Sequence, residues 1–225
     1  MKTAEKPRVV AIGASAGGLS AFRKLIGNLP GDTGMAFVLL SHILRGSVSL
    51  LPEILARATP MPVIQVTRGM RLRANHLYII PPDKLMGYRA GAVYLEPRPP
   101  GGINHAIDHF LFSLAADQAD GSIGIILSGD GSDGAEGIKI LKEKSGGVTM
   151  AQEPGSAASQ SMPINAIQID HVDYILSPED IAHELAAMSS RDAKVAYRPL
   201  QVLWMRKRGP SRRRPRKGPM GGLDR

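Results

Sequence analysis

The chain has 225 residues, carries a formal net charge of +8 and is 43% hydrophobic. This length supports one large domain or two small ones, with a substantial buried core. The absence of cysteine excludes disulfides, thiolate metal sites and a cysteine nucleophile. No apolar run reaches the roughly 20 residues that a membrane span needs, and the polar first residues do not resemble a signal peptide, so we expect a cytoplasmic protein without a membrane span.

Strands and helices are predicted to alternate along the first part of the chain. Buried strands are predicted at 9–12, 36–40 and 62–66, and helices at 19–29 and 47–58. Pro52 is compatible with the second helix only if it falls in the first turn. Further on, the segments HLYIIPP and AVYLEP are separated by a polar stretch with two glycines, which predicts a β-hairpin.

The alternation resumes in the second half. Strands are predicted at 123–127, 148–151 and 174–176, and helices at 104–119 and 135–144. The segment Ser177-Pro178-Glu179-Asp180 is typical of the start of a final helix. Together the elements predict an α/β fold with three α/β/α layers: a doubly wound, mostly parallel sheet with an added antiparallel β-hairpin.

Reactive side chains follow three of the predicted strands. Ser15 follows the first strand, Ser41-His42 the second, and Asp130 and Asp133 lie in the glycine-rich segment after IGIIL. Because the carboxyl ends of parallel strands meet at one edge of a sheet, a serine, a histidine and a carboxylate can converge there. These three groups together can activate a serine hydroxyl as a nucleophile.

The segment Gly13-Ala14-Ser15-Ala16-Gly17 has two interpretations. It fits the G-x-S-x-G turn that presents a nucleophilic serine between a strand and a helix. The helix that begins near Gly18 would favour a developing oxyanion there. Glycine-rich turns of this kind also bind phosphates, although the dinucleotide-binding glycine pattern and the P-loop lysine are absent. The segment alone leaves both interpretations open, and the order serine, histidine, acid differs from that of ordinary α/β-hydrolases.

Five separated segments make the comparison specific: IGASAGGLSAF, LLSHI, SGDGSDGAEGIKILKEKSGG, AQEP and SMPINAI. In this order they resemble the catalytic domain of the CheB-type chemotaxis protein-glutamate methylesterases, across residues 8–190. The similarity is greatest to the form found in methylesterase–methyltransferase fusions. The resemblance implies a short tail at 1–7, a methylesterase domain at 8–190 and a C-terminal extension at 191–225.

The resemblance also implies a reaction and its residues. Members hydrolyse γ-glutamyl methyl esters on chemoreceptor helices, and many deamidate receptor glutamines, without a metal or organic cofactor. Ser15 matches the nucleophile, His42 the histidine and Asp133 the aspartate of the triad. Backbone amides of Ala16 and Asp130 are the expected oxyanion donors. The expected partners are methylated chemoreceptors or receptor-like coiled-coil helices.

Several positions depart from the family pattern. Asp130 stands where members usually have Met or Thr, and its charge could oppose an oxyanion. Ala16 and Ser161 replace a common Thr and Gly. Only seven residues precede the first strand, so we expect no receiver domain in this chain. A separate protein could then regulate the site. The alternative function is a catalytically weak signalling or receptor-docking module of the same fold.

Other features have less specific interpretations. His105 and His109 share a helix face and could bind a metal, but surface or substrate-groove positions are favoured. Met162 is expected in a loop, either packed in the core or lining the substrate groove. Nine of the 28 basic residues lie in 206–225 beside one acidic residue, so the rest of the chain is neutral. This tail is expected to be disordered; it could bind an anionic partner or be a solvated segment without one.

Overall fold

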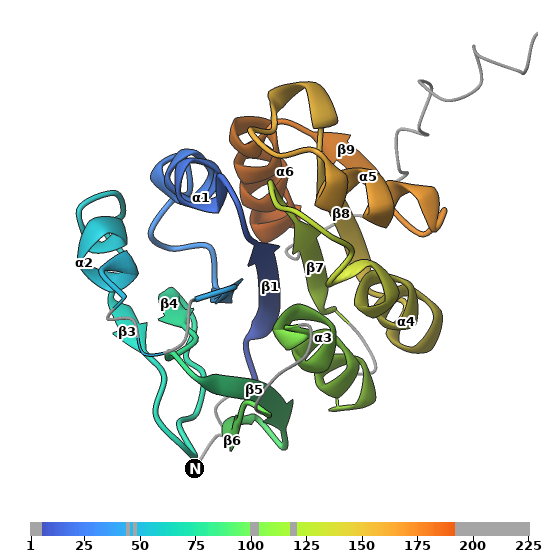
Figure 1. Ribbon diagram of the computed structural model, residues 1–225. Helices are drawn as coiled ribbons and strands as arrows, with labels where there is room; N and C mark the ends of the chain where they lie inside the picture. Colours follow the sequence, from blue (N-terminus) through green and yellow to red (C-terminus); the bar gives the residue numbers. More distant parts are fainter. Residues whose placement is uncertain (1–5, 44–45, 47–48, 100–103, 118–120, 192–225) are drawn as a thin grey trace, which may run out of the picture.

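The computed structural model describes residues 6–43, 46, 49–99, 104–117 and 121–191. Its centre is a parallel sheet with the strand order β3-β4-β2-β1-β7-β8-β9 (Figure 1). The strands are β1 (Arg8–Ala14), β2 (Met35–Ser41), β3 (Val63–Gln65), β4 (His76–Ile79), β7 (Ile123–Ile126), β8 (Val148–Gln152) and β9 (Tyr174–Leu176). β2, the next strand along the chain, pairs with one side of β1, and β7 pairs with the other side. The winding direction of the sheet therefore changes beside β1.

Helices cover both faces of this sheet, as the sequence predicted for a doubly wound fold. One face packs against α1 (Gly18–Gly27), α2 (Leu51–Ala56) and α6 (Pro178–Arg191). The other packs against α3 (Ala106–Asp117), α4 (Ala135–Ser145) and α5 (Ser161–Gln168). Along β1, Val9 and Ala11 face the α3 side, whereas Val10 and Ile12 face the α1 side. None of the described helices is long and apolar enough to cross a membrane.

The β-hairpin exists, but its predicted pairing is wrong. It joins β5 (Lys84–Arg89) to β6 (Ala92–Pro97), and it packs beside α3. The segment HLYI, expected in the hairpin, is β4 of the main sheet, buried between β2 and β3. Residues 84–89 have the pattern of a polar connection because only half of β5 is buried in this separate two-stranded sheet. The turn of the hairpin places Ala90 at a positive φ of 52° in place of the usual Asn.

Four helical segments bear on the sequence prediction. α2 begins at Leu51 rather than at 47, and Pro52 lies in its first turn, where its missing N–H is not needed. The Ser177 hydroxyl caps α6 as predicted, because it accepts the Asp180 N–H at 3.1 Å. The short 3₁₀ helix η1 (Pro154–Ser156) and α5 were not predicted. The C-terminal extension beyond Arg191 lies outside the described residues.

Candidate active site

The register of two neighbouring strands brings Ser15 and His42 to the same level. Ala14 pairs with Ser41 at the end of the β1–β2 ladder, so Ser15 and His42 are the next residues on each chain. Adjacent strands lie about 4.8 Å apart, and the alternation along both strands assigns the two side chains to the α3 face. On its other side, the Ser15 N–H donates to the Ser128 carbonyl after β7, at 3.0 Å. Ser15 therefore lies where the winding direction of the sheet changes, the usual place for a binding crevice in such folds.

Gly17 makes the turn between β1 and α1 possible. It has a φ of +74° directly before α1, and the Ser15 carbonyl accepts the Gly18 N–H at 2.9 Å. A Cβ at Gly17 would lie 2.7 Å from both Ala158 Cβ and Ser128 Oγ. Glycine is therefore required by both backbone conformation and space. The turn leaves Ser15 partly exposed at the amino end of α1.

His42 and Asp133 form a close, shielded pair. The His42 Nε2 lies 2.7 Å from Asp133 Oδ2, and the two side chains are 20% and 2% exposed. A carboxylate only accepts, so Nε2 carries the proton and Nδ1 is the basic nitrogen. This is the reverse of the common triad, in which the carboxylate binds Nδ1. Among the described residues the Ser15 hydroxyl has no hydrogen-bond partner, and such contacts often tighten only when substrate binds.

The Asp133 carboxylate also caps the start of α3. Its Oδ2 accepts the Ile107 N–H at 3.0 Å, and its Oδ1 accepts the Asp108 N–H at 2.9 Å. The first N–H groups of a helix have no partner within the helix, and they carry the positive end of its dipole. The start of α3 therefore holds Asp133 in place and offsets part of its charge.

Asp108 is a residue that the sequence reasoning missed. Its buried Oδ1 accepts the N–H groups of Gly134 at 2.9 Å and Gly137 at 2.7 Å, at the start of α4. Burial, together with the nearby charge of Asp133, raises the pKa of Asp108 to about 6, although the hydrogen bonds from the two amides oppose the shift. An acidic residue in the first turn of a helix is a capping signal.

The two histidines of α3 do not act as a pair. His105 is exposed, with Nδ1 3.9 Å from Asp108 Oδ2, whereas His109 Nε2 lies 3.8 Å from Glu96 of β6. One ligand atom each from His105, Asp108 and Asp133 lies within 4.8 Å of the others, close enough to hold a metal ion. However, three of the four carboxylate oxygens already accept backbone N–H groups. The donor set therefore fits a hydrogen-bonded capping arrangement better than a metal site.

The glycine-rich segment after β7 is joined to the start of α5. The Gly129 N–H donates to the Ser159 carbonyl at 3.1 Å, and the Gly129 carbonyl accepts the Met162 N–H at 2.9 Å. Met162 lies in α5 rather than in the expected loop and is fully buried, so it packs in the core. The Ser159 hydroxyl donates to the exposed Asp130 carboxylate. The N–H groups of Ala16 and Asp130 have no hydrogen-bond partner within the described part of the chain.

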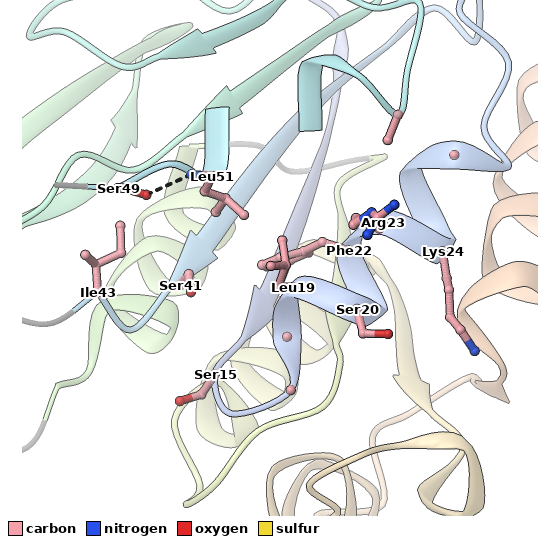
Figure 2. A pocket seen from close by; sticks show the side chains of 14 residues that line it. Ser15, Leu19, Ser20, Phe22, Arg23, Lys24, Ser41, Ile43, Ser49 and Leu51 are labelled. Carbon is pink, nitrogen blue, oxygen red and sulfur yellow. Dashed lines mark hydrogen bonds between the residues drawn. The ribbon is translucent and has the colours of Figure 1, made fainter. Parts of the chain in front are cut away.

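A hollow of about 850 Å³ extends from Ser15 along α1. Figure 2 shows Ser15 at one end of it and Arg23 and Lys24 on the α1 side. Its apolar lining includes Leu19, Phe22, Ile43 and Leu51. Lys24 is paired with Glu179 of α6 at 3.3 Å, which leaves Arg23 as the cation of the hollow. A mostly apolar hollow with a cation at one end can receive an amphipathic segment next to the serine.

Comparisons with known proteins agree with this architecture. The family model of CheB methylesterase matches residues 10–185. The Syntrophus aciditrophicus protein-glutamate methylesterase/protein-glutamine glutaminase 1 is 29% identical over 190 residues, covering 84% of this chain and 54% of the relative. The Anaeromyxobacter dehalogenans protein-glutamate methylesterase/protein-glutamine glutaminase 3 is 34% identical over 182 residues, covering 80% of this chain and 53% of the relative.

A Leptospira interrogans relative is 33% identical over 182 residues, which cover 77% of this chain and 90% of the relative. The crystal structure of the Thermotoga maritima CheB methylesterase catalytic domain superposes with a TM-score of 0.74 at 26% identity, covering 82% of this chain and 100% of that domain. The chain spans about half the length of the first two relatives. These matches bear out the resemblance and the predicted fold class: the chain belongs to the CheB methylesterase family.

Proposed function

We propose that this chain is a serine esterase that hydrolyses glutamate methyl esters on chemoreceptors or receptor-like coiled-coil helices. The observation that carries the proposal is the 2.7 Å hydrogen bond between His42 and Asp133, beside Ser15 at the carboxyl edge of the sheet. A buried carboxylate that orients a histidine next to a serine is the arrangement of an activated nucleophile. The family membership and the names of the relatives support the same reaction.

The proposed reaction has two steps. Ser15 Oγ attacks the ester carbonyl carbon while His42 Nδ1 takes the hydroxyl proton. The tetrahedral intermediate collapses, the C–O bond to the methoxy group breaks, and His42 returns the proton so that methanol leaves. Water then attacks the acyl-enzyme with His42 again as the base, which frees glutamate and restores Ser15. Asp133 holds the ring and stabilises its cationic form throughout.

Backbone amides are the proposed donors to the oxyanion. The N–H groups of Ala16 and Asp130 flank Ser15 in the two turns of the site, and both lack a partner among the described residues. The amino end of α1 adds a favourable dipole. Preorganised donors of this kind commonly contribute a large share of rate enhancement.

The substrate is proposed to be a protein segment rather than an enclosed small molecule. The hollow beside Ser15 combines apolar side chains with Arg23, which suits one face of a helix with acidic neighbours. A glutamine side chain presents the same carbonyl geometry with ammonia as the leaving group. The site is therefore proposed to deamidate glutamines as well, as the relatives' names suggest for them.

The test is release of methanol from a helical receptor peptide that carries one glutamate methyl ester. We expect release by the wild type, loss of release in Ser15→Ala, and release retained at saturating peptide in Ser20→Ala, where any change is expected in KM alone. Ser20 is the matched control because it is an exposed serine of α1 that lines the same hollow. Equal, negligible release by wild type and Ser15→Ala would favour a receptor-docking module that lacks esterase activity.

A further inference from the structure

Two helices of the site cap each other through exchanged carboxylates. Asp133, which stands two residues before α4, accepts the N–H groups of Ile107 and Asp108 at the start of α3. Asp108, in the first turn of α3, accepts the N–H groups of Gly134 and Gly137 at the start of α4. Gly134, the residue before α4, offers no side-chain cap of its own. The beginning of each helix is therefore fixed by the carboxylate of the other.

This exchange secures Asp133 from two directions. The Asp108 N–H holds Asp133 Oδ1 at 2.9 Å, while the Asp108 carboxylate holds the N–H of Gly134, the next residue along the chain from Asp133. Backbone and side chain of one residue thus fix both the carboxylate and the peptide that follows it. The opposite oxygen, Asp133 Oδ2, is the one that receives His42 Nε2.

The arrangement is costly if its only role is to stabilise the fold. As whole residues, Asp108 and Asp133 are 8% and 4% exposed, and the repulsion between two buried carboxylates contributes to the raised pKa of Asp108. Among the described residues, only the exposed His105, with Nδ1 at 3.9 Å, offers Asp108 a nearby basic group. A neutral Asn or Ser caps a helix equally well without this repulsion. Capping alone therefore does not explain Asp108. What distinguishes it is that its Oδ1 accepts the N–H of Gly134, directly after Asp133, together with the N–H of Gly137.

We propose that Asp108 is a positioning residue of the active site, which keeps the turn before α4 in the one arrangement that holds Asp133 against His42. Asp108 acts through Asp133 and does not touch the substrate. The inference rests on the proposed function of Ser15, His42 and Asp133. Displacements of about 1 Å in a catalytic arrangement can lower the rate on the order of 100-fold. The hydrogen bonds by which Asp108 holds the turn before α4 should therefore affect turnover.

The test compares Asp108→Ala with Asp108→Asn. Alanine removes the acceptor, whereas asparagine keeps an oxygen that can accept both amides. We expect kcat for methyl-ester hydrolysis, normalised to reactive Ser15 by active-site titration, to fall by about 10- to 100-fold in the alanine variant, with KM unchanged. The asparagine variant is expected to recover most of this loss. If the alanine variant does not fold, Asp108→Ser replaces it, because a hydroxyl is too short to reach both amides.

Asp173→Ala is the matched control for stability. The Asp173 carboxylate accepts the Thr149 N–H at 2.9 Å and pairs with Lys142, near the opposite, amino end of the sheet. This variant should lose stability but keep kcat. An equal loss of kcat in Asp173→Ala, or an unchanged kcat in Asp108→Ala, would overturn the inference.

A second readout does not depend on turnover. The proton that His42 Nε2 donates to Asp133 should give a downfield NMR signal, absent from His42→Gln. We expect this signal to weaken or shift in Asp108→Ala and to persist in Asp108→Asn and Asp173→Ala. An unchanged signal in Asp108→Ala would overturn the inference. If the wild type releases no methanol, the proposed function fails, and this signal still decides whether Asp108 positions Asp133.

Discussion

Replacing Asp133 by Asn tests the triad and the capping of α3 together. Three donors converge on the carboxylate: His42 Nε2 and the Ile107 N–H point to Oδ2, and the Asp108 N–H points to Oδ1. An amide has one accepting oxygen and one donating NH₂ group. We expect the oxygen to take the Oδ2 position, where it satisfies two donors, so that the NH₂ group faces the Asp108 N–H.

The size of the effect follows from this orientation. One buried N–H loses its acceptor, which costs about 1–3 kcal/mol of unfolding free energy. The histidine keeps its tautomer but loses the negative charge that stabilises its cationic form. We expect kcat to fall by about 10²- to 10⁴-fold, because general-base catalysis contributes that range and loss of a triad carboxylate reaches its upper end. KM should not change, since Asp133 is buried behind His42.

The assay is methanol release over a range of ester-peptide concentrations, combined with urea denaturation of each variant. Asp173→Asn is the control, because it alters a carboxylate that also accepts a backbone N–H but lies away from the site. The reasoning is refuted by an unchanged kcat in folded Asp133→Asn. It is also refuted if Asp173→Asn lowers kcat as strongly.

Three further predictions concern neighbouring residues. Burial raises the pKa of Asp108 from 3.8 to about 6, so folding favours its protonated form, and this stabilisation is complete below 3.8 and lost as the pH rises through 6. When the pH is lowered from 7 to 4, the unfolding free energy of the wild type, measured by urea denaturation, should therefore rise by up to about 3 kcal/mol relative to that of Asp108→Asn. Unfolding free energies that change with pH in the same way in both proteins would contradict this prediction. A Cβ at Gly129 would lie 2.7 Å from Met162 Sδ and 3.0 Å from Ser15 Cβ, so Gly129→Ala should cost about 1–3 kcal/mol in thermal or urea unfolding and lower kcat. Asp130→Asn removes a negative charge beside the proposed oxyanion and should raise kcat by up to about fivefold, from roughly 1 kcal/mol of repulsion, while a fall in kcat would argue against that repulsion.

The sequence was informative where one local pattern decides the structure. Apolar runs followed by glycine or Ser-His located the ends of β1 and β2, and parallel pairing then placed Ser15 and His42 at one level. The same reasoning failed for the hairpin. HLYI was paired with the wrong partner because a strand buried in the main sheet and a hairpin strand share the same apolar pattern.

The supporting contacts of Asp133 could not be predicted because they are long-range. Its carboxylate binds amides 25 and 26 residues away, and Asp108 binds amides 26 and 29 residues away. The α5 segment was missed for a similar reason, since its packing against Gly129 follows from tertiary contacts rather than from periodicity. The catalytic roles of Ser15, His42 and Asp133, and of the Ala16 and Asp130 amides, remain predictions for the experiments above.

The most direct test of the central claim is to trap the acyl-enzyme. A methyl-ester peptide is mixed with excess wild-type protein, the reaction is quenched with acid within the first turnover, and the protein is digested for peptide mapping by mass spectrometry. The account predicts an adduct of the peptide less methanol on Ser15, absent from Ser15→Ala and present in Ser20→Ala. Methanol release with an adduct on another residue, or release that persists in Ser15→Ala, would contradict it.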